Sequence, residues 1–136
     1  GPAFEAQLAR HPRTRYRGAI PQGQVAGELA GAAALLLPTT WATEGMPGAI
    51  VEAAMVGTPV VAAATPAIAE VVEDGVSGLL VDPTDVSALA EAVRRLLTCR
   101  GLAARLGSAL RERAGAFTVD AVVSRLSARL AAEGWR

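Results

Sequence analysis

W-A-T-E-G-M-P-G-A-I-V-E-A-A-M-V-G-T-P-V-V-A, residues 41–62, holds the most informative pattern in the chain. Pro47 is expected as the first residue of a helix, because its missing N–H costs nothing there and its fixed φ favours helical entry. Gly57, with the Thr-Pro that follows it, is expected to end this helix. Between these limits every residue is small or apolar except Glu52. An all-round apolar pattern predicts a buried helix.

The Glu52 carboxylate therefore needs a partner, since Glu is almost never fully buried without one. No Lys or Arg occurs between Gly18 and Glu91, so no ion pair can form with a residue nearby in the sequence. A ligand hydroxyl and a backbone amide are both suitable partners. Glu44 lies eight residues earlier in a loop of small residues. Taken alone, Glu44 would be a solvated loop carboxylate.

Short apolar runs at residues 34–37, 60–64 and 79–81 predict strands, and the first two are expected to be buried on both faces as in a parallel sheet. Helical patterns alternate with these runs, which indicates βαβ units. The predicted fold class is therefore α/β, a Rossmann-like doubly wound parallel sheet followed by C-terminal helices. The most regular helix is capped by Thr84 or Asp85, and its Glu91 is expected to pair with Arg95.

The remaining pattern is less regular and lies mainly at the two ends of the chain. The expected helices are 4–10, 22–33, 68–72, 102–110 and 119–130, the last opened by Thr118, and a short strand is expected at 14–18.

Composition limits the classes of function. A length of 136 residues with 51% apolar content suits one domain that buries about two-thirds of its unfolded surface. Thirteen basic and thirteen acidic residues cancel, and no basic stripe suggests a nucleic-acid partner. A single cysteine and the lack of metal-ligand spacing predict neither a disulfide nor a metal site. No apolar run is long enough to span a bilayer. We expect a cytoplasmic location, with peripheral membrane association left open.

The loop and helix after the strand at 34–37 form a candidate binding site. In doubly wound sheets, ligands bind beyond the carboxyl ends of the strands, where a helix begins. The amides of Gly48, Ala49 and Ile50 are expected to be free donors that suit a phosphate. Glu52 lies one turn beyond Gly48 on the same face. Acceptors on both sides of an amide cradle suit a molecule with hydroxyls at both ends and phosphates between them, such as a nucleotide sugar.

The segment from Glu44 to Ala62, followed by E-V-V-E-D-G-V-S-G-L-L-V and the helix after it, resembles the second Rossmann-like domain of a known enzyme family. This family is the retaining GT-B-fold glycosyltransferases of family 4, also called glycosyl transferases group 1. The glutamate pair is a weak signal alone. The G-T-P-V-V-A and D-G-x-x-G-L-L-V segments at matching distances make the resemblance specific.

The resemblance implies roles for individual residues. Glu44 would contact the hydroxyls of the transferred sugar and is the residue expected to be catalytic. The donor-binding set would comprise Glu44, Gly45, Met46, Gly48, Ala49, Ile50 and Glu52, with Glu52 on the ribose hydroxyls. The resemblance implies a metal-independent hexosyltransferase that retains configuration at the anomeric carbon. Its donor would be UDP- or GDP-linked, with no cofactor, and it would serve bacterial-type glycan or glycoconjugate synthesis.

By the same resemblance, residues 1–136 are one partial domain, the donor-binding half of the enzyme. The acceptor-binding N-terminal domain and an Arg/Lys pair for the donor diphosphate would precede Gly1. In the sheet order 3-2-1-4-5-6, the strand at 14–18 would be strand 3 and those at 34–37, 60–64 and 79–81 strands 4 to 6. We therefore expect residues 1–33 to be detached from the main sheet, mobile or paired with something non-native, and this chain alone to be inactive.

The acceptor, a glycan, a lipid or a small molecule, is left open by the sequence. A non-catalytic nucleotide-binding module and a GT-B-type nucleotide-sugar epimerase are the alternative functions.

Overall fold

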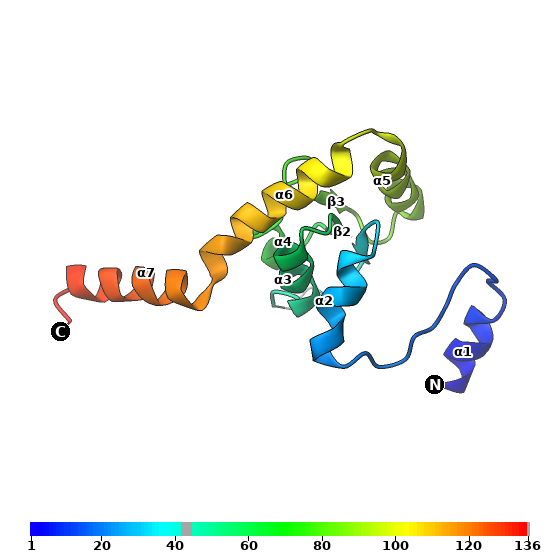
Figure 1. Cartoon of the computed structure of the whole chain (residues 1–136), viewed down its shortest axis with the longest axis horizontal. Coiled ribbons are helices and arrows are strands. Elements are labelled where there is room, and N and C mark those ends of the chain that lie inside the picture. The colour runs from blue at the N-terminus through cyan, green and yellow to red at the C-terminus, as the bar shows by residue number, and fades with distance from the viewer. Residues whose placement is uncertain (42–44, 136) are drawn as a thin grey trace.

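A computed structural model describes residues 1–41 and 45–135. Its sheet has three parallel strands in the order β1-β2-β3 (Figure 1), which are β1 (Leu35–Leu37), β2 (Val60–Ala63) and β3 (Leu79–Val81). Leu36 lies opposite Val61, and Ala62 lies opposite Leu80. The predicted α/β class is confirmed, and each strand lies within one residue of its predicted limits. The order agrees with three consecutive strands of a doubly wound sheet.

Helices alternate with the strands and then accumulate at the C-terminal end (Figure 1). The helical elements are α1 (Pro2–Leu8), α2 (Gln22–Ala30), α3 (Gly48–Val56), α4 (Pro66–Ala69), α5 (Val86–Thr98), α6 (Leu102–Ala114), the 3-10 turn η1 (Gly115–Phe117) and α7 (Val119–Ala132). The predicted helices are present, except that α4 begins two residues earlier than the expected segment and ends before it does.

Two apolar clusters show that helices cover both faces of the sheet. On one face, Val60 and Ala62 pack with Ile50 of α3. On the other face, Val61 packs with Leu96 of α5. This alternation from Val60 to Ala62 is the period of two that places successive side chains on opposite faces. All four residues of β2 are buried, as predicted.

Helix α6 contributes to both clusters. Leu110 is fully buried in the cluster with α3, and Leu106 is fully buried in the cluster with α5. Helix α6 therefore packs against the apolar clusters on both faces of the sheet.

The approach of α6 to the end of α3 depends on two glycines. Gly57 adopts a left-handed conformation, with φ of 78°, and ends α3. A Cβ placed on Gly107 would lie 2.0 Å from the Gly57 carbonyl oxygen, so only glycine fits at this crossing. The two backbones are therefore in direct contact.

The helix caps agree with the sequence, but one ion pair differs. The Asp85 carboxylate accepts from the Ala88 N–H at 2.9 Å, and the Thr118 hydroxyl accepts from the Ala121 N–H at 3.3 Å. The predicted pairing of Glu91 with Arg95 is wrong, because Glu91 pairs with Arg94 at 2.6 Å. Positions three and four residues ahead are both neighbours on a helix, so the pattern could not distinguish them.

Two predictions for the N-terminal region are wrong. Residues 14–18 form no strand, because no neighbouring strand pairs with them. Helix α2 does not lie apart from the sheet, since it packs on α3 and the Thr58 hydroxyl donates to the Leu29 carbonyl at 2.7 Å. Only α1 agrees with the expected separation: it lies at the end of an extended segment, away from the layered helices and strands (Figure 1).

Strand β1 and helix α3 are less buried than predicted, and helix α7 exposes an apolar stripe. Strand β1 is not buried on both faces, since Leu36 is 45% exposed. Helix α3 is not buried all round either, since Met55 is 64% exposed and Glu52 is half-buried. Along α7 the apolar stripe formed by Val119, Val122, Val123, Leu126 and Leu130 is exposed.

Candidate functional site

The candidate site lies where β1 ends and α3 begins. Pro47 is the N-cap residue of α3 with an extended backbone, φ −67° and ψ 124°, so the helix begins at Gly48, one residue later than predicted. The Gly48 and Ala49 amides have no acceptor among the described residues. The Ile50 N–H donates to the Pro47 carbonyl at 3.0 Å, so the expectation that Ile50 offers a free amide is wrong. Two free donors remain at the positive end of the helix.

The side chains around these amides divide into exposed and core positions. Gly45 and Gly48 are exposed, and no atom lies within 4 Å of a Cβ built on either of them. Met46 is partly buried against the cluster on the α3 face of the sheet, and Ile50 is fully buried within it. The local surface therefore consists largely of accessible backbone, while Met46 and Ile50 anchor the segment.

Glu52 lies one turn into α3 and is half-buried. Its carboxylate has no hydrogen bond or ion pair to another described residue. Contrary to the prediction, burial therefore forces no partner on Glu52, because this side chain lies on a partly open side of α3. A carboxylate in this position is a free acceptor one turn beyond the two free amides.

Glu44 lies outside the described residues. The role assigned to it depends on the resemblance alone and stays a prediction.

The next two strand ends lie at the same edge of the sheet, since the strands are parallel. After β2, the Thr65 hydroxyl accepts from the Ile68 N–H at 3.4 Å and caps α4. After β3, the Asp82 carboxylate accepts from the Thr84 hydroxyl at 2.7 Å and from the Thr84 N–H at 2.8 Å. These two hydrogen bonds lower the pKa of Asp82. They close the turn that leads into α5.

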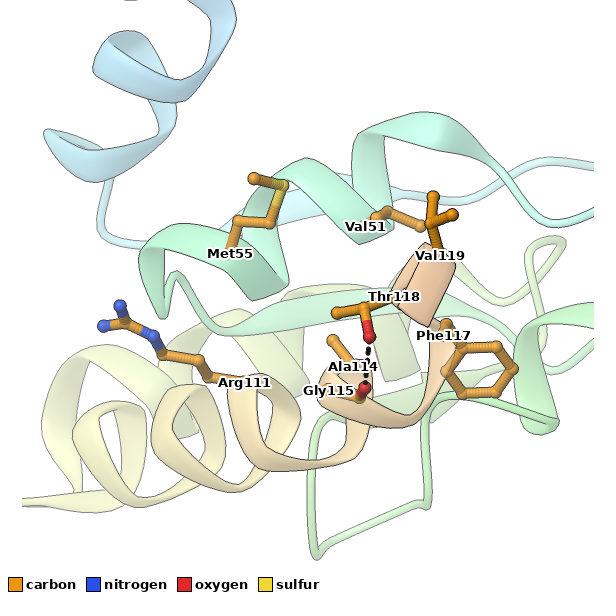
Figure 2. Close-up of a pocket in the computed structure, with 8 residues that line it drawn as sticks. All are labelled: Val51, Met55, Arg111, Ala114, Gly115, Phe117, Thr118 and Val119. Atoms are coloured by element: carbon orange, nitrogen blue, oxygen red, sulfur yellow. Dashed lines mark hydrogen bonds between the residues drawn. The ribbon is translucent and has the colours of Figure 1, made fainter. Parts of the chain in front are cut away.

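A groove of about 500 Å³ lies on another side of α3, between that helix and the start of α7 (Figure 2). Val51, Met55, Ala114, Phe117 and Val119 line it, together with Arg111, Gly115 and Thr118. The Thr118 hydroxyl donates to the Gly115 carbonyl at 3.1 Å and so is satisfied within the chain. None of the described residues of the predicted donor-binding set lines this groove, which is mainly apolar.

Neither a metal cluster nor a membrane helix is found in the described part of the chain. Among residues 1–41 and 45–135 no three His, Cys, Asp or Glu side chains are grouped closely enough to hold a metal ion. No helix in these ranges has the length and apolar character that crossing a bilayer requires.

Two residues that hold the segment between β2 and β3 were not identified from the sequence. Arg113 of α6 donates to the Val71 carbonyl at 2.9 Å and to the Glu73 carboxylate at 2.9 Å. The Ser77 hydroxyl is fully buried and accepts from the Glu73 N–H at 2.8 Å. The Ser77-Gly78 dipeptide is typical of a turn, so the sequence did indicate a turn at Ser77. No local pattern marks Arg113, because its partners lie about 40 residues earlier.

The family model for "Glycosyl transferases group 1" matches residues 1–99. A D-inositol 3-phosphate glycosyltransferase of Geodermatophilus obscurus is 44% identical over 81 residues, which is 57% of this chain and 17% of that protein. The Streptomyces griseus protein of the same name is 33% identical over 119 residues, 88% of this chain and 25% of that protein.

Among solved structures, the sucrose-phosphate synthase of Thermosynechococcus elongatus superposes with a TM-score of 0.79 at 29% identity. The superposition covers 97% of this chain and 34% of the synthase chain. This chain therefore spans a quarter or less of the two curated relatives above.

Proposed function

We propose that this chain, which belongs to the glycosyl transferases group 1 family, is the nucleotide-sugar-binding part of a retaining glycosyltransferase. The enzyme would transfer a sugar from a UDP- or GDP-linked donor to an acceptor without a metal ion. The observation that carries the proposal is the start of α3. There, two amides without acceptors among the described residues precede a half-buried, unpaired carboxylate by one helical turn.

The chemistry of these groups matches the donor. Free amides at a helix N-terminus favour a phosphate through direct hydrogen bonds and the helix dipole. The Glu52 carboxylate suits two neighbouring ribose hydroxyls, because an ionised acceptor forms the stronger class of hydrogen bond. Exposed glycines at positions 45 and 48 let a diphosphate approach the backbone closely.

The remaining roles follow from family membership. Glu44 would contact the sugar and act at the reacting end of the donor, and the loop from Gly45 to Ala49 would hold the sugar and the phosphates. An N-terminal domain of the same protein would supply the acceptor site. Proteins named D-inositol 3-phosphate glycosyltransferase and sucrose-phosphate synthase among the relatives support transfer to a hydroxyl-bearing acceptor.

Replacing Glu52 with Gln tests the ribose contact. In the intact enzyme, the change keeps the shape of the side chain but removes its charge, and we expect the binding free energy of a nucleotide sugar to weaken by about 1–3 kcal/mol. Titration calorimetry with UDP-glucose and GDP-mannose measures this change. Glu112→Gln, which removes the same charge from an exposed position on α6, is the matched control and should leave affinity unchanged. Unchanged affinity in Glu52→Gln would remove Glu52 from the site.

Replacing Glu44 with Ala tests the sugar contact. In the intact enzyme, we expect the variant to lose turnover and affinity for the sugar nucleotide while keeping its affinity for free UDP or GDP, because Glu44 is assigned to the sugar alone. Calorimetry with the nucleotide and with its sugar conjugate separates the two effects. Equal losses for both ligands would place Glu44 elsewhere.

A further inference from the structure

Arg113 of α6 connects that helix to the segment that follows β2. Its Nε donates to the Val71 carbonyl at 2.9 Å, and its Nη2 donates to the Glu70 carbonyl at 3.4 Å. Its Nη1 pairs with the Glu73 carboxylate at 2.9 Å. The planar guanidinium therefore holds three points within four consecutive residues, an arrangement that a single ammonium cannot reproduce.

The two carbonyls held by Arg113 lie immediately after α4. Carbonyls in the last turn of a helix have no partner within that helix, and a cation there also complements the helix dipole. At the other end of α4 the Thr65 hydroxyl accepts from the Ile68 N–H. The short helix is thus fixed at its start by its own cap and at its end by α6.

A continuous apolar contact connects this segment to the candidate site. Ile68, Val71 and Val72 are buried in the same cluster as Ile50, and Met46 packs against that cluster. Ile50 belongs to the first turn of α3, directly after the free amides of Gly48 and Ala49. A shift of residues 66–72 would therefore be transmitted to the start of α3.

A second arginine of α6 supports the same arrangement. Arg105 lies two turns before Arg113 and donates to the Gly75 carbonyl at 3.3 Å. Contacts at residues 70, 71, 73 and 75 mean that α6 holds the first part of the connection between α4 and β3.

We propose that Arg113 is a positioning residue of the donor site, which fixes the segment after β2 and, through the buried cluster that contains Ile68 and Ile50, the start of α3. This inference rests on the proposed function, since the affinity that Arg113 supports is the affinity for a nucleotide sugar. Arg113 itself does not touch the ligand.

Arg113→Gln tests the inference, with Arg111→Gln as the matched control. Arg111 lies on the same helix, is exposed and has no hydrogen bond or ion pair to another described residue, so the control makes the same change of charge without the contacts. We expect Arg113→Gln to bind UDP-glucose or GDP-mannose about 3- to 30-fold more weakly in titration calorimetry, the range for coupling through packed side chains. The Arg111→Gln control should bind like the wild type.

Amide hydrogen exchange separates positioning from a general loss of stability. In Arg113→Gln, exchange should increase about tenfold or more in residues 66–73 and stay unchanged in α5. Affinity equal to that of the wild type would overturn the inference. An equal loss in both variants, or an equal increase of exchange in α5, would also overturn it.

Two further measurements cover the cases in which Arg113→Gln does not fold or the wild type does not bind. If Arg113→Gln does not fold, Glu73→Gln removes only the carboxylate partner and should give a smaller affinity loss with faster exchange at residues 70–73. Unchanged affinity in that variant would overturn the inference. These measurements use the intact enzyme, which includes the segment before Gly1. If the intact wild type binds neither sugar nucleotide, the proposed function fails; if the intact wild type binds and Arg113→Gln binds equally well, only the role of Arg113 fails.

Discussion

Gly107→Ala is expected to lower the free energy of unfolding by about 3 kcal/mol or more, because overpacking a close contact forces the backbone apart. The added methyl group would lie 2.0 Å from the Gly57 carbonyl oxygen and 2.9 Å from its carbonyl carbon. Both are backbone atoms, so no side chain can rotate away. The only relief is a movement of α6 away from the end of α3, which would loosen the clusters on both faces of the sheet.

Urea unfolding measures this loss, and Gly27→Ala is the matched control. Gly27 is a helical glycine in the middle of α2 with no atom within 4 Å of a Cβ built on it. Alanine there should raise stability by about 0.5–1 kcal/mol through helix propensity alone. A Gly107→Ala protein as stable as the wild type would show that α6 can leave Gly57 without cost.

Leu110→Ala is expected to cost about 2–5 kcal/mol, the range for removing a leucine from a packed core. Leu110 is fully buried in the cluster that also holds Ile50 and Ile68. The cavity would therefore open within the cluster that anchors the start of α3 and α4. We expect the loss to appear in urea unfolding without a change in the slope of the transition.

Leu126→Ala is the control for Leu110→Ala, because the same atoms are removed from a leucine that is 56% exposed on α7. Its expected cost is below about 0.5 kcal/mol. Similar losses for the two variants would contradict the burial described above and would mean that the α7 stripe is covered in solution.

The strands could be predicted closely from the sequence because each is a short apolar run bounded by proline, glycine or a turn. The run ending at Leu37 stops at Pro38, and the run at 79–81 follows Ser77-Gly78. Residues 14–18 show the limit of this reasoning. A strand exists only if another strand pairs with it, and its own residues do not contain that information.

The candidate site could be located from the sequence but its details could not. The position of Gly48 and Ala49 at the start of a helix was predictable from Pro47 and the apolar run that follows. The pairing of the Ile50 amide with Pro47 and the openness around Glu52 depend on the local turn and on how α3 packs. The hydrogen bonds of Arg113 to residues 70–73 join segments that are about 40 residues apart in the sequence, so no short sequence pattern predicts them.

The position of α6 late in the chain has a consequence for synthesis on the ribosome, where residues emerge in order from the N-terminus. All three strands precede α6, yet Leu106 and Leu110 are needed to complete the two clusters. Until residue 106 has emerged, neither face of the sheet can be closed, and the α3 face with Val60 stays accessible until residue 110 follows. Exposed apolar strands of this kind are targets for aggregation, so the nascent chain is most vulnerable in the interval between β3 and α6.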